Sequence, residues 1–414
     1  MNKPTPLRIG FATAEYPGWT PYGGIGVYVQ TMAAGMAQLG HQTFVLLCSP
    51  ERSAREETSD VPVVIVAPRG TIRLPFPIGR GPGMMVSRCL AATARELHLD
   101  ILEAPEFGGL TAFVPAKDSR PFKVVVRLHM CYSLVRSLNN SRPTSLKEVA
   151  TNFLIDRIER RAIIHADAMT SISTRTTVET LRVHGLSRDD IVTIPNPVSP
   201  AFFDVPPRTT ARIRPDPTVL FVGRLEWRKG PDILVRAFPE VLKRFPKARL
   251  RLVGSDTPTA PGDNSMLNHL RSLVTGEVLS HIEFLGARPA GELPQIYGEA
   301  DVCIFPSRWE GFGIVCAEAM ASGRPVIVPR NSGFAEHITD HGNGLLSEGA
   351  ESGDLAKSII ELLSNTELRH RVGSAARHFA LANFSPKSVA ELASQIHYRS
   401  LMPDLDPKQN LVKR

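Results

Sequence analysis

The sequence predicts an α/β fold of two domains, each a parallel sheet with helices on both faces, which face one another across a cleft. Strand-like apolar runs alternate with helical patterns in two successive series, an alternation typical of parallel sheets. A proline-dense segment separates the two series. The length of 414 residues also suits two domains better than one.

Residues 7–194 carry the first series. The apolar run 7–14 predicts the opening strand, and the run 123–128 is apolar enough for a parallel strand buried on both faces. Helices are predicted over about 26–39 and about 145–165, where apolar side chains recur on one face. Further strands are predicted at 43–48, 62–67, 101–103, 168–173 and 191–194.

Proline marks the domain boundary. Seven prolines lie between residues 195 and 217, a density that blocks helix and sheet and stiffens the chain. We therefore expect a first domain over 1–197, a linker over 198–217 and a second domain over 218–384. Residues 385–414 are predicted to form a helix that packs back on the first domain, followed by a polar tail.

The second series begins with a strand at 218–222 and a helix at about 231–245, with Pro231 in its first turn, where a missing N–H costs nothing. Further strands are predicted at 249–253, 282–285, 301–305 and 325–328, and further helices at about 263–275, 290–299, 313–322 and 352–402. Ligands of such folds bind beyond the carboxyl ends of the strands.

Composition excludes several classes of protein. No run of about twenty apolar residues predicts a membrane-spanning helix. The N-terminus does not read as a signal peptide and the five cysteines are scattered, so we expect a cytoplasmic protein without structural zinc. The net charge of +7 is dispersed, which argues against nucleic acid. It indicates either a solvated basic surface or contact with an anionic membrane or phosphorylated substrate.

The segment 305–325 carries the strongest candidate site. Glu310 follows a predicted strand, Gly311, Phe312 and Gly313 lead into a helix, and Glu318 lies within that helix. Glycines at a helix start let an anion approach free N–H groups. Two carboxylates nearby make sense if they accept hydrogen bonds from hydroxyls beside a phosphate, as in a sugar and a ribose. The alternative is that both are ordinary surface carboxylates.

Arg224 and Lys229 form a second candidate site, in the loop after the first strand of the second domain. Arginine offers a planar fork and lysine a point charge, and their spacing lets one loop turn both toward a diphosphate. Arg228 is expected to point elsewhere, to the surface. An exposed charged turn without a ligand is the alternative.

The first domain offers weaker candidates at its strand ends. Gly23 and Gly24 open the first helix without a full dinucleotide fingerprint, so they predict either a phosphate or sugar contact or only a tight turn. His129 follows the strand 123–128 and is either a hydrogen-bonding or acid–base group or a structural histidine. Further candidates at the same edge, for contact with a second substrate, are Tyr16, Trp19, Glu106, Arg127 and Arg136.

Taken in order, these segments resemble the retaining glycosyltransferases of family 4, which have the GT-B fold of two Rossmann-like domains. The resemblance covers nearly the whole chain and includes GGIGVYVQTMAAGMAQLGH, HADAMTSIS, IPNPV, GRLEWRKGPDILVRAF, FLGARPAGELPQIYGEADVCIFPS and EGFGIVCAEAMASGRPVIVP. Seven residues separate Glu310 from Glu318, as in the family's paired-glutamate motif.

The resemblance implies roles for these residues. Glu318 would bind ribose hydroxyls, Glu310 the hydroxyls of the transferred sugar, and Arg224 and Lys229 the leaving diphosphate. His129 would contact the donor sugar, and the loop of Gly23 and Gly24 would close on phosphates or acceptor. The first domain would then be the acceptor side and the second the nucleotide-sugar donor domain.

The resemblance also implies transfer of a hexose-type sugar from a nucleotide-diphosphate donor to a sugar or lipid-linked acceptor, with retained anomeric configuration. The product would belong to polysaccharide or glycoconjugate synthesis. No cofactor or metal is expected, because two cationic side chains and a helix start do the work of a divalent ion. The one Asp-x-Asp, Asp404 to Asp406, lies in the polar tail.

Three other functions fit parts of the pattern. A nucleotide-sugar epimerase or hydrolase needs a larger acid–base set around the sugar than one histidine. An inactive scaffold subunit is a second alternative. The full set Arg224, Lys229, Glu310 and Glu318 is present, which argues against it. A nicotinamide dehydrogenase needs fingerprint glycines and an acidic partner that are not in place.

Overall fold

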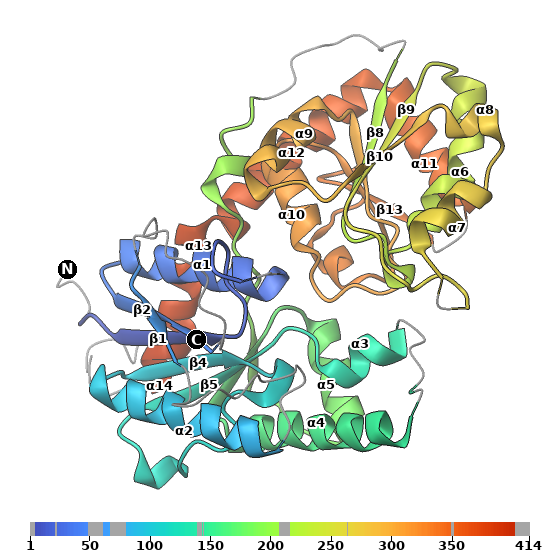
Figure 1. The fold of residues 1–414 in the computed structure, drawn as a ribbon. Helices are drawn as coiled ribbons and strands as arrows, with labels where there is room; N and C mark the ends of the chain where they lie inside the picture. The colour runs from blue at the N-terminus through green and yellow to red at the C-terminus, as the bar shows by residue number, and fades with distance from the viewer. Residues whose placement is uncertain are drawn as a thin grey trace. The chain divides into compact units, whose positions relative to one another are not determined.

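The computed structural model describes residues 5–20, 23–48, 61–66, 80–138, 143, 145–206, 216–262, 264–348 and 352–401 (Figure 1). The chain divides into two compact units. The first comprises Met1–Arg136, Arg142–Pro197 and Pro386–Arg414, and the second comprises Ser137–Ser141 and Val198–Ser385. Among the described helices none is long and apolar enough to cross a membrane.

The first unit is built on a parallel sheet of seven strands in the order β3-β2-β1-β4-β5-β6-β7. The strands are β1 (Arg8–Thr13), β2 (Gln42–Leu47), β3 (Val63–Ile65), β4 (Ile101–Pro105), β5 (Lys123–Leu128), β6 (Ala168–Ser171) and β7 (Ile191–Thr193). The order reverses between β1 and β4, which makes the carboxyl ends of these strands a topological switch point.

Helices cover both faces of this sheet (Figure 1). They are α1 (Gly24–Gln38), α2 (Arg80–Glu96), α3 (Tyr132–Leu138), α4 (Leu146–His165) and α5 (Thr174–His184), joined by α13 (Pro386–Leu392) and α14 (Arg399–Leu401) from the end of the chain. The sequence did not predict α2, α3 or α5. The α2 segment opens with two glycines and a proline, which hide its helical period.

The second unit has a parallel sheet of six strands in the order β10-β9-β8-β11-β12-β13. The strands are β8 (Thr218–Val222), β9 (Arg249–Val253), β10 (Ile282–Gly286), β11 (Val302–Ile304), β12 (Val326–Pro329) and β13 (Leu345–Ser347). The helices are α6 (Pro231–Arg244), α7 (Met266–Ser272), α8 (Gly276–Leu279), α9 (Leu293–Glu299), α10 (Ile314–Ala321), α11 (Ser352–Ser364) and α12 (Thr366–Phe384). The switch point lies between β8 and β11.

The last described segment returns to the first unit. The helices predicted to fill 352–402 are α11, α12, α13, a π-helical turn at Ala393–Tyr398 and α14. Helix α13 packs on α1, and a Cβ on Gly35 would come within 2.7 Å of the carbonyl oxygen of Pro386. The Tyr398 hydroxyl donates to buried Glu103, and His41 Nε2 lies 2.9 Å from Ser394 Oγ. The polar tail with Asp404 and Asp406 lies outside the described residues.

Candidate functional site

Two loops meet at the switch point of the second sheet. One follows β8 and leads to α6, and the other follows β11 and leads to α10. Gly230 holds them together, because its φ of 68° is left-handed and a Cβ there would lie 2.1 Å from the carbonyl oxygen of Pro306. Arg308 N also donates to the Arg228 carbonyl at 2.9 Å. The residues predicted separately in the two loops therefore belong to one site.

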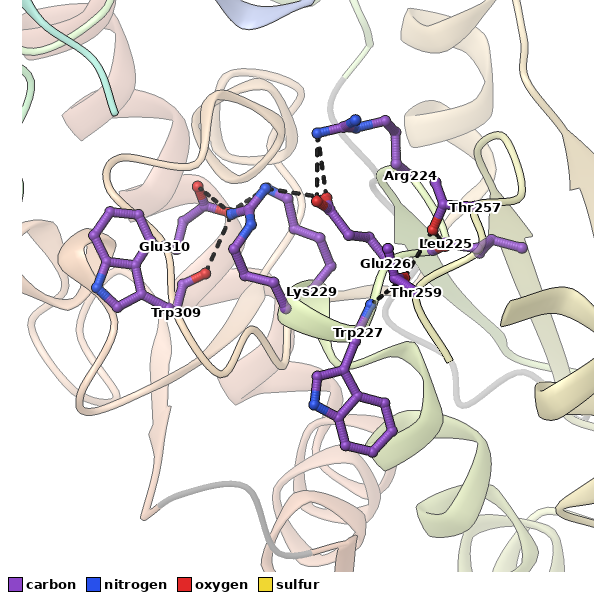
Figure 2. Close-up of polar contacts among 10 residues, drawn as sticks. Arg224, Leu225, Glu226, Trp227, Lys229, Thr257, Thr259, Trp309 and Glu310 are labelled. Carbon is purple, nitrogen blue, oxygen red and sulfur yellow. Dashed lines mark hydrogen bonds and ion pairs between the residues drawn. The ribbon is translucent and has the colours of Figure 1, made fainter. Parts of the chain in front are cut away.

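Lys229 and Glu310 form an ion pair across the two loops (Figure 2). Burial alone would raise the pKa of Glu310, but Lys229 and Arg228 outweigh it and the pKa lies below its ordinary value. Burial lowers the pKa of Lys229 in spite of its partner. A carboxylate at the edge of the sheet is thus held ionised between two cations.

The prediction that Arg228 points to the surface was wrong. Its side chain is 4% exposed, and its Nη2 lies 3.1 Å from Glu226 Oε2 while Nη1 lies 3.8 Å from Glu310 Oε1. The short 3-10 turn Trp227–Lys229 directs Arg228 and Lys229 toward the same carboxylate. Sequence spacing alone gave no sign of this turn.

Glu226 is an acidic residue of this site that the sequence did not single out. Its buried carboxylate lies 3.3 Å from Arg224 Nη2 (Figure 2). The Arg224 side chain is 59% exposed, so this contact orients a guanidinium whose other N–H groups remain open to a ligand. Glu226 therefore links Arg224 to Arg228 and, through it, to Glu310.

The glycine turn before α10 has the geometry expected for an anion site. Gly313 adopts φ 79° at the start of the helix and adds no side chain there, and the Glu310 side chain lies beside it. Phe312 is buried against Phe334 and Phe384, so it anchors the turn and offers a ligand only its backbone. Gly333 N, in the segment after β12, donates to the Glu310 carbonyl at 2.9 Å and fixes the same turn.

Glu318 lies inside α10 and is 6% exposed. The Tyr297 hydroxyl lies 3.1 Å from its carboxyl and 3.0 Å from the Val315 carbonyl oxygen. Burial raises the pKa of Glu318 to about 8. A protonated Glu318 satisfies both contacts, because it can donate to the tyrosine oxygen while the tyrosine donates to Val315.

His129 directly follows β5 in the first unit. Its ring meets Tyr28 edge to face at 5.0 Å, and the side chain is largely buried. Burial and the nearby Arg127 lower the pKa of His129 well below its ordinary value. The imidazole is therefore neutral at pH 7, which suits hydrogen bonding to an uncharged hydroxyl.

Glu106 and Arg127 do not present their side chains as the sequence analysis expected. Both carboxylate oxygens of the fully buried Glu106 accept the backbone N–H of His129, at 2.8 and 2.9 Å. Burial raises the pKa of Glu106 to about 7. Arg127 is buried over the Tyr28 ring at 4.2 Å and donates to the Ile194 carbonyl at 2.7 Å. Both residues support the loop of His129 from beneath rather than face a substrate.

The remaining acceptor candidates differ in how far their side chains are buried. Tyr16 is 2% exposed and belongs to the core, whereas Trp19 is half-buried at the margin of the same core. Arg136 is paired with Asp156 at 3.0 Å. Trp19 and Arg136 are therefore only partly exposed, and Tyr16 offers no side-chain surface to a ligand.

Gly23 caps α1 and Gly24 begins it, so neither of these two residues adds a side chain at the helix start. The structure adds a residue that the sequence analysis did not single out, Glu15, whose Oε1 accepts the Gly26 N–H at 2.9 Å. A carboxylate already occupies part of the anion position at this helix start. The loop is consequently better suited to sugar hydroxyls than to a phosphate.

Cys131, Glu159 and His184 are the one set of three or more potential metal ligands found among the described residues. All three are buried. Glu159 already accepts the Gly108 N–H at 3.0 Å and the Tyr132 N–H at 3.1 Å. Its carboxyl therefore holds the loops after β4 and β5 together, which is a structural task.

Comparison with known proteins supports the same reading of the fold. The family described as Glycosyltransferase Family 4 matches residues 22–202, and the family described as Glycosyl transferases group 1 matches residues 208–379. Between them they span most of the chain. Each match covers one of the two units.

The chain is also similar in sequence to proteins with established names. The D-inositol 3-phosphate glycosyltransferase of Nocardia farcinica (strain IFM 10152) is 27% identical over 94% of this chain and 88% of its own. The spore coat protein SA of Bacillus subtilis (strain 168) is 35% identical over 42% of this chain and 46% of its own.

Solved structures match the fold along nearly the whole chain. Sucrose-phosphate synthase from Thermosynechococcus elongatus superposes with a TM-score of 0.73 at 21% identity, over 96% of this chain and 100% of that one. The Anabaena protein HepE in complex with UDP-glucose superposes with a TM-score of 0.65 at 20% identity, over 94% and 98%.

Proposed function

Because the chain belongs to the family 4 glycosyltransferases with the GT-B fold, we propose that it transfers a hexose from a nucleotide-diphosphate sugar with retention of configuration. The acceptor we propose is a sugar or a lipid-linked sugar, in the synthesis of a polysaccharide or glycoconjugate. We place the enzyme in the cytoplasm, with peripheral contact at the inner face of the plasma membrane.

The observation that carries this proposal is the half-buried Lys229–Glu310 pair at the switch point of the second unit, with Arg228 beside it. An ion pair built only for stability would gain little from such a position, because burial of both charges offsets most of their attraction. At a strand end beside a helix start, the same groups form a ready site for a ligand with phosphates and hydroxyls.

Each group has a task in the proposed complex. Lys229, Arg224 and the N–H groups at the start of α10 bind the diphosphate, with Arg224 oriented by Glu226. Glu310, held ionised by its two cations, accepts hydrogen bonds from hydroxyls of the transferred sugar. Glu318 exchanges its contact with Tyr297 for the ribose hydroxyls.

The transfer step we propose needs no covalent enzyme intermediate. The bond between the anomeric carbon and the β-phosphate oxygen breaks, and the acceptor oxygen attacks the same face from which the diphosphate leaves. The acceptor proton passes to an oxygen of the departing diphosphate. Lys229 and Arg224 stabilise the charge that develops there, so no metal is required in this proposal.

The relatives narrow the first substrates to try. HepE is solved with UDP-glucose, which favours a uridine donor as the first candidate. D-inositol 3-phosphate glycosyltransferases act, by name, on a phosphorylated polyol, so phosphorylated polyols belong in the first acceptor panel.

A thermal-shift panel of nucleoside diphosphates and their sugars tests the donor class. Binding raises the apparent stability by mass action, by about 2.7 kcal/mol at a hundredfold excess over Kd. We expect one base to stand out, both as free diphosphate and as sugar conjugate. Radiolabelled donor with and without acceptor then tests the reaction. Turnover that is the same without any acceptor would favour an epimerase or hydrolase, and no shift with any nucleotide would overturn the proposal.

A further inference from the structure

Helix α4 carries an exposed apolar stripe that the transferase chemistry does not use. Leu146, Val149, Phe153 and Ile164 are 89%, 47%, 60% and 44% exposed. The steps between them follow the helical repeat, with Arg157 and Arg160 continuing the stripe between Phe153 and Ile164. The opposite side of the helix, which includes Ile155 and Ile158, is buried in the first unit.

A surface hollow of about 710 Å³ lies along the second half of this stripe. Its lining is apolar apart from three arginines and one histidine, and includes no carboxylate. Figure 1 shows α4 along its full length at the margin of the first unit. Large apolar side chains that gather in one exposed stripe indicate a surface that another molecule covers.

The arginines are held in place beside the apolar side chains. Arg157 lies over the Phe153 ring at 5.4 Å and Arg161 over the Phe113 ring at 5.3 Å. Arg160 Nε donates to the His184 carbonyl at 3.0 Å, and Arg161 Nε donates to the Ala112 carbonyl at 2.7 Å. Their remaining N–H groups can reach an anion outside the protein.

Of the three acidic residues of α4, Glu148 lies opposite the stripe in the helical repeat, and Asp156 and Glu159 are engaged elsewhere. Asp156 pairs with Arg136, and Glu159 is fully buried under the loops after β4 and β5. The surface therefore combines bulky apolar groups with at least three cations, Arg157, Arg160 and Arg161. A second copy of this chain would bring its own arginines against these, whereas an anionic lipid surface would complement them.

We propose that the α4 face is a membrane-docking surface, on which the helix lies in the plane of an anionic bilayer. Phe153, Leu146 and Ile164 enter the boundary between headgroups and acyl chains, and the arginines bind lipid phosphates. The docking gives a physical basis to the peripheral contact proposed above, but it does not depend on the transfer reaction. Each arginine near such a surface strengthens binding about fivefold.

Co-sedimentation with lipid vesicles tests the proposal. We expect the wild-type chain to bind vesicles of phosphatidylcholine with phosphatidylglycerol and to bind pure phosphatidylcholine far less. The variant Arg157→Gln/Arg160→Gln/Arg161→Gln should lose at least tenfold, and Leu146→Ser/Phe153→Ser should lose a similar factor on the same vesicles. Added salt should weaken binding further in the wild type than in the triple variant.

Matched controls lie on the second unit. Arg236→Gln/Lys243→Gln/Arg244→Gln removes three exposed cations of α6, and Leu381→Ser removes an exposed apolar side chain of α12. Both should bind vesicles like the wild type. Because the α4 residues are exposed, their variants should retain the thermal midpoint and calorimetric affinity for a nucleoside diphosphate, which separates this proposal from the proposed function.

Two results would overturn the docking proposal. The first is vesicle binding that is absent in the wild type, or equal in the α4 variants and the controls. The second is concentration-dependent self-association in sedimentation velocity that the α4 variants abolish, which would identify the stripe as an interface between two copies.

Discussion

At the scale of single residues, the site is a chain of alternating charges. Arg224 contacts Glu226, Glu226 contacts Arg228, and Arg228 and Lys229 contact Glu310. Each carboxylate holds a cation in position for a ligand. The arrangement explains how three cations can lie in one short loop, because the two carboxylates offset their mutual repulsion.

The two glutamates of the paired motif are predicted to act on different parts of the donor. Glu310→Ala should bind free nucleoside diphosphate nearly as the wild type does, but should use and discriminate donor sugars poorly. Glu318→Ala should lose affinity for diphosphate and donor alike, by about 1.5–3 kcal/mol for a charged acceptor. Calorimetry on both variants measures this, with exposed Glu240→Ala of α6 as control. Equal losses in the two variants would refute this division of roles. A reversed pattern would mean that the donor binds in the opposite orientation.

Nucleotide binding is predicted to strengthen as pH rises toward 8. Burial raises the pKa of Glu318 to about 8, so the free protein holds a proton there at pH 7, whereas a carboxylate is the better acceptor for ribose hydroxyls. If binding requires the ionised form, affinity rises up to about tenfold per pH unit below 8 and levels off above it. Calorimetry of the wild type and Glu318→Gln at several pH values checks this. A similar slope in Glu318→Gln would assign the titration to another group.

At the scale of elements, α1 and α13 are matched through one glycine. Alanine normally stabilises a helix by about 1 kcal/mol relative to glycine. At Gly35, however, the added methyl group would meet the Pro386 carbonyl at 2.7 Å, and backbone cannot move aside cheaply. We expect Gly35→Ala to destabilise the first unit by about 1–3 kcal/mol and lower its thermal midpoint by several degrees.

Gly353→Ala in the first turn of α11 is the matched control, because nothing lies within 4 Å of its added methyl group. Differential scanning calorimetry should show an unchanged or slightly higher midpoint for this variant. A Gly35→Ala protein as stable as the wild type would mean that α13 does not pack on α1 as closely as described.

The sequence predicted elements with strong periodicity and missed those that depend on context. Strands such as β5 and β8 are continuous apolar runs, and α4 begins with a Ser145 cap, so each is visible in isolation. The short strand β13 has only three residues, and its parallel pairing with β12 is not visible in the sequence. The break between α12 and α13 similarly reflects the return of the chain to α1.

The same distinction between local sequence and context applies to the candidate site. Glu310, Glu318, Arg224 and Lys229 follow strand ends or lie in the helix behind one, and order along the chain points to them. Glu226 and Arg228 were missed because their importance comes from contacts across the loop. Glu106 was a candidate for acceptor contact because it follows β4, but its side chain lies inward, where it accepts the His129 backbone N–H.

At the scale of the whole molecule, the account predicts transfer that is independent of divalent metal. In the proposed mechanism, Arg224, Lys229 and the start of α10 stabilise the departing diphosphate in place of an ion. The initial rate in excess EDTA should equal the rate with added magnesium or manganese. A rate that vanishes in EDTA and returns with either ion would contradict this.

The most direct test of the central claim is calorimetric titration of the wild type and Lys229→Gln with the nucleoside diphosphate that stabilises the protein most, in excess EDTA. Glutamine retains a hydrogen bond to Glu310 but loses the charge. We expect the wild type to bind and Lys229→Gln to bind at least tenfold more weakly, which corresponds to a loss of about 1.4 kcal/mol in binding free energy. Lys243→Gln, at an exposed lysine of α6, should bind normally. Equal affinities for the wild type and Lys229→Gln would contradict the claim that these loops hold the donor diphosphate.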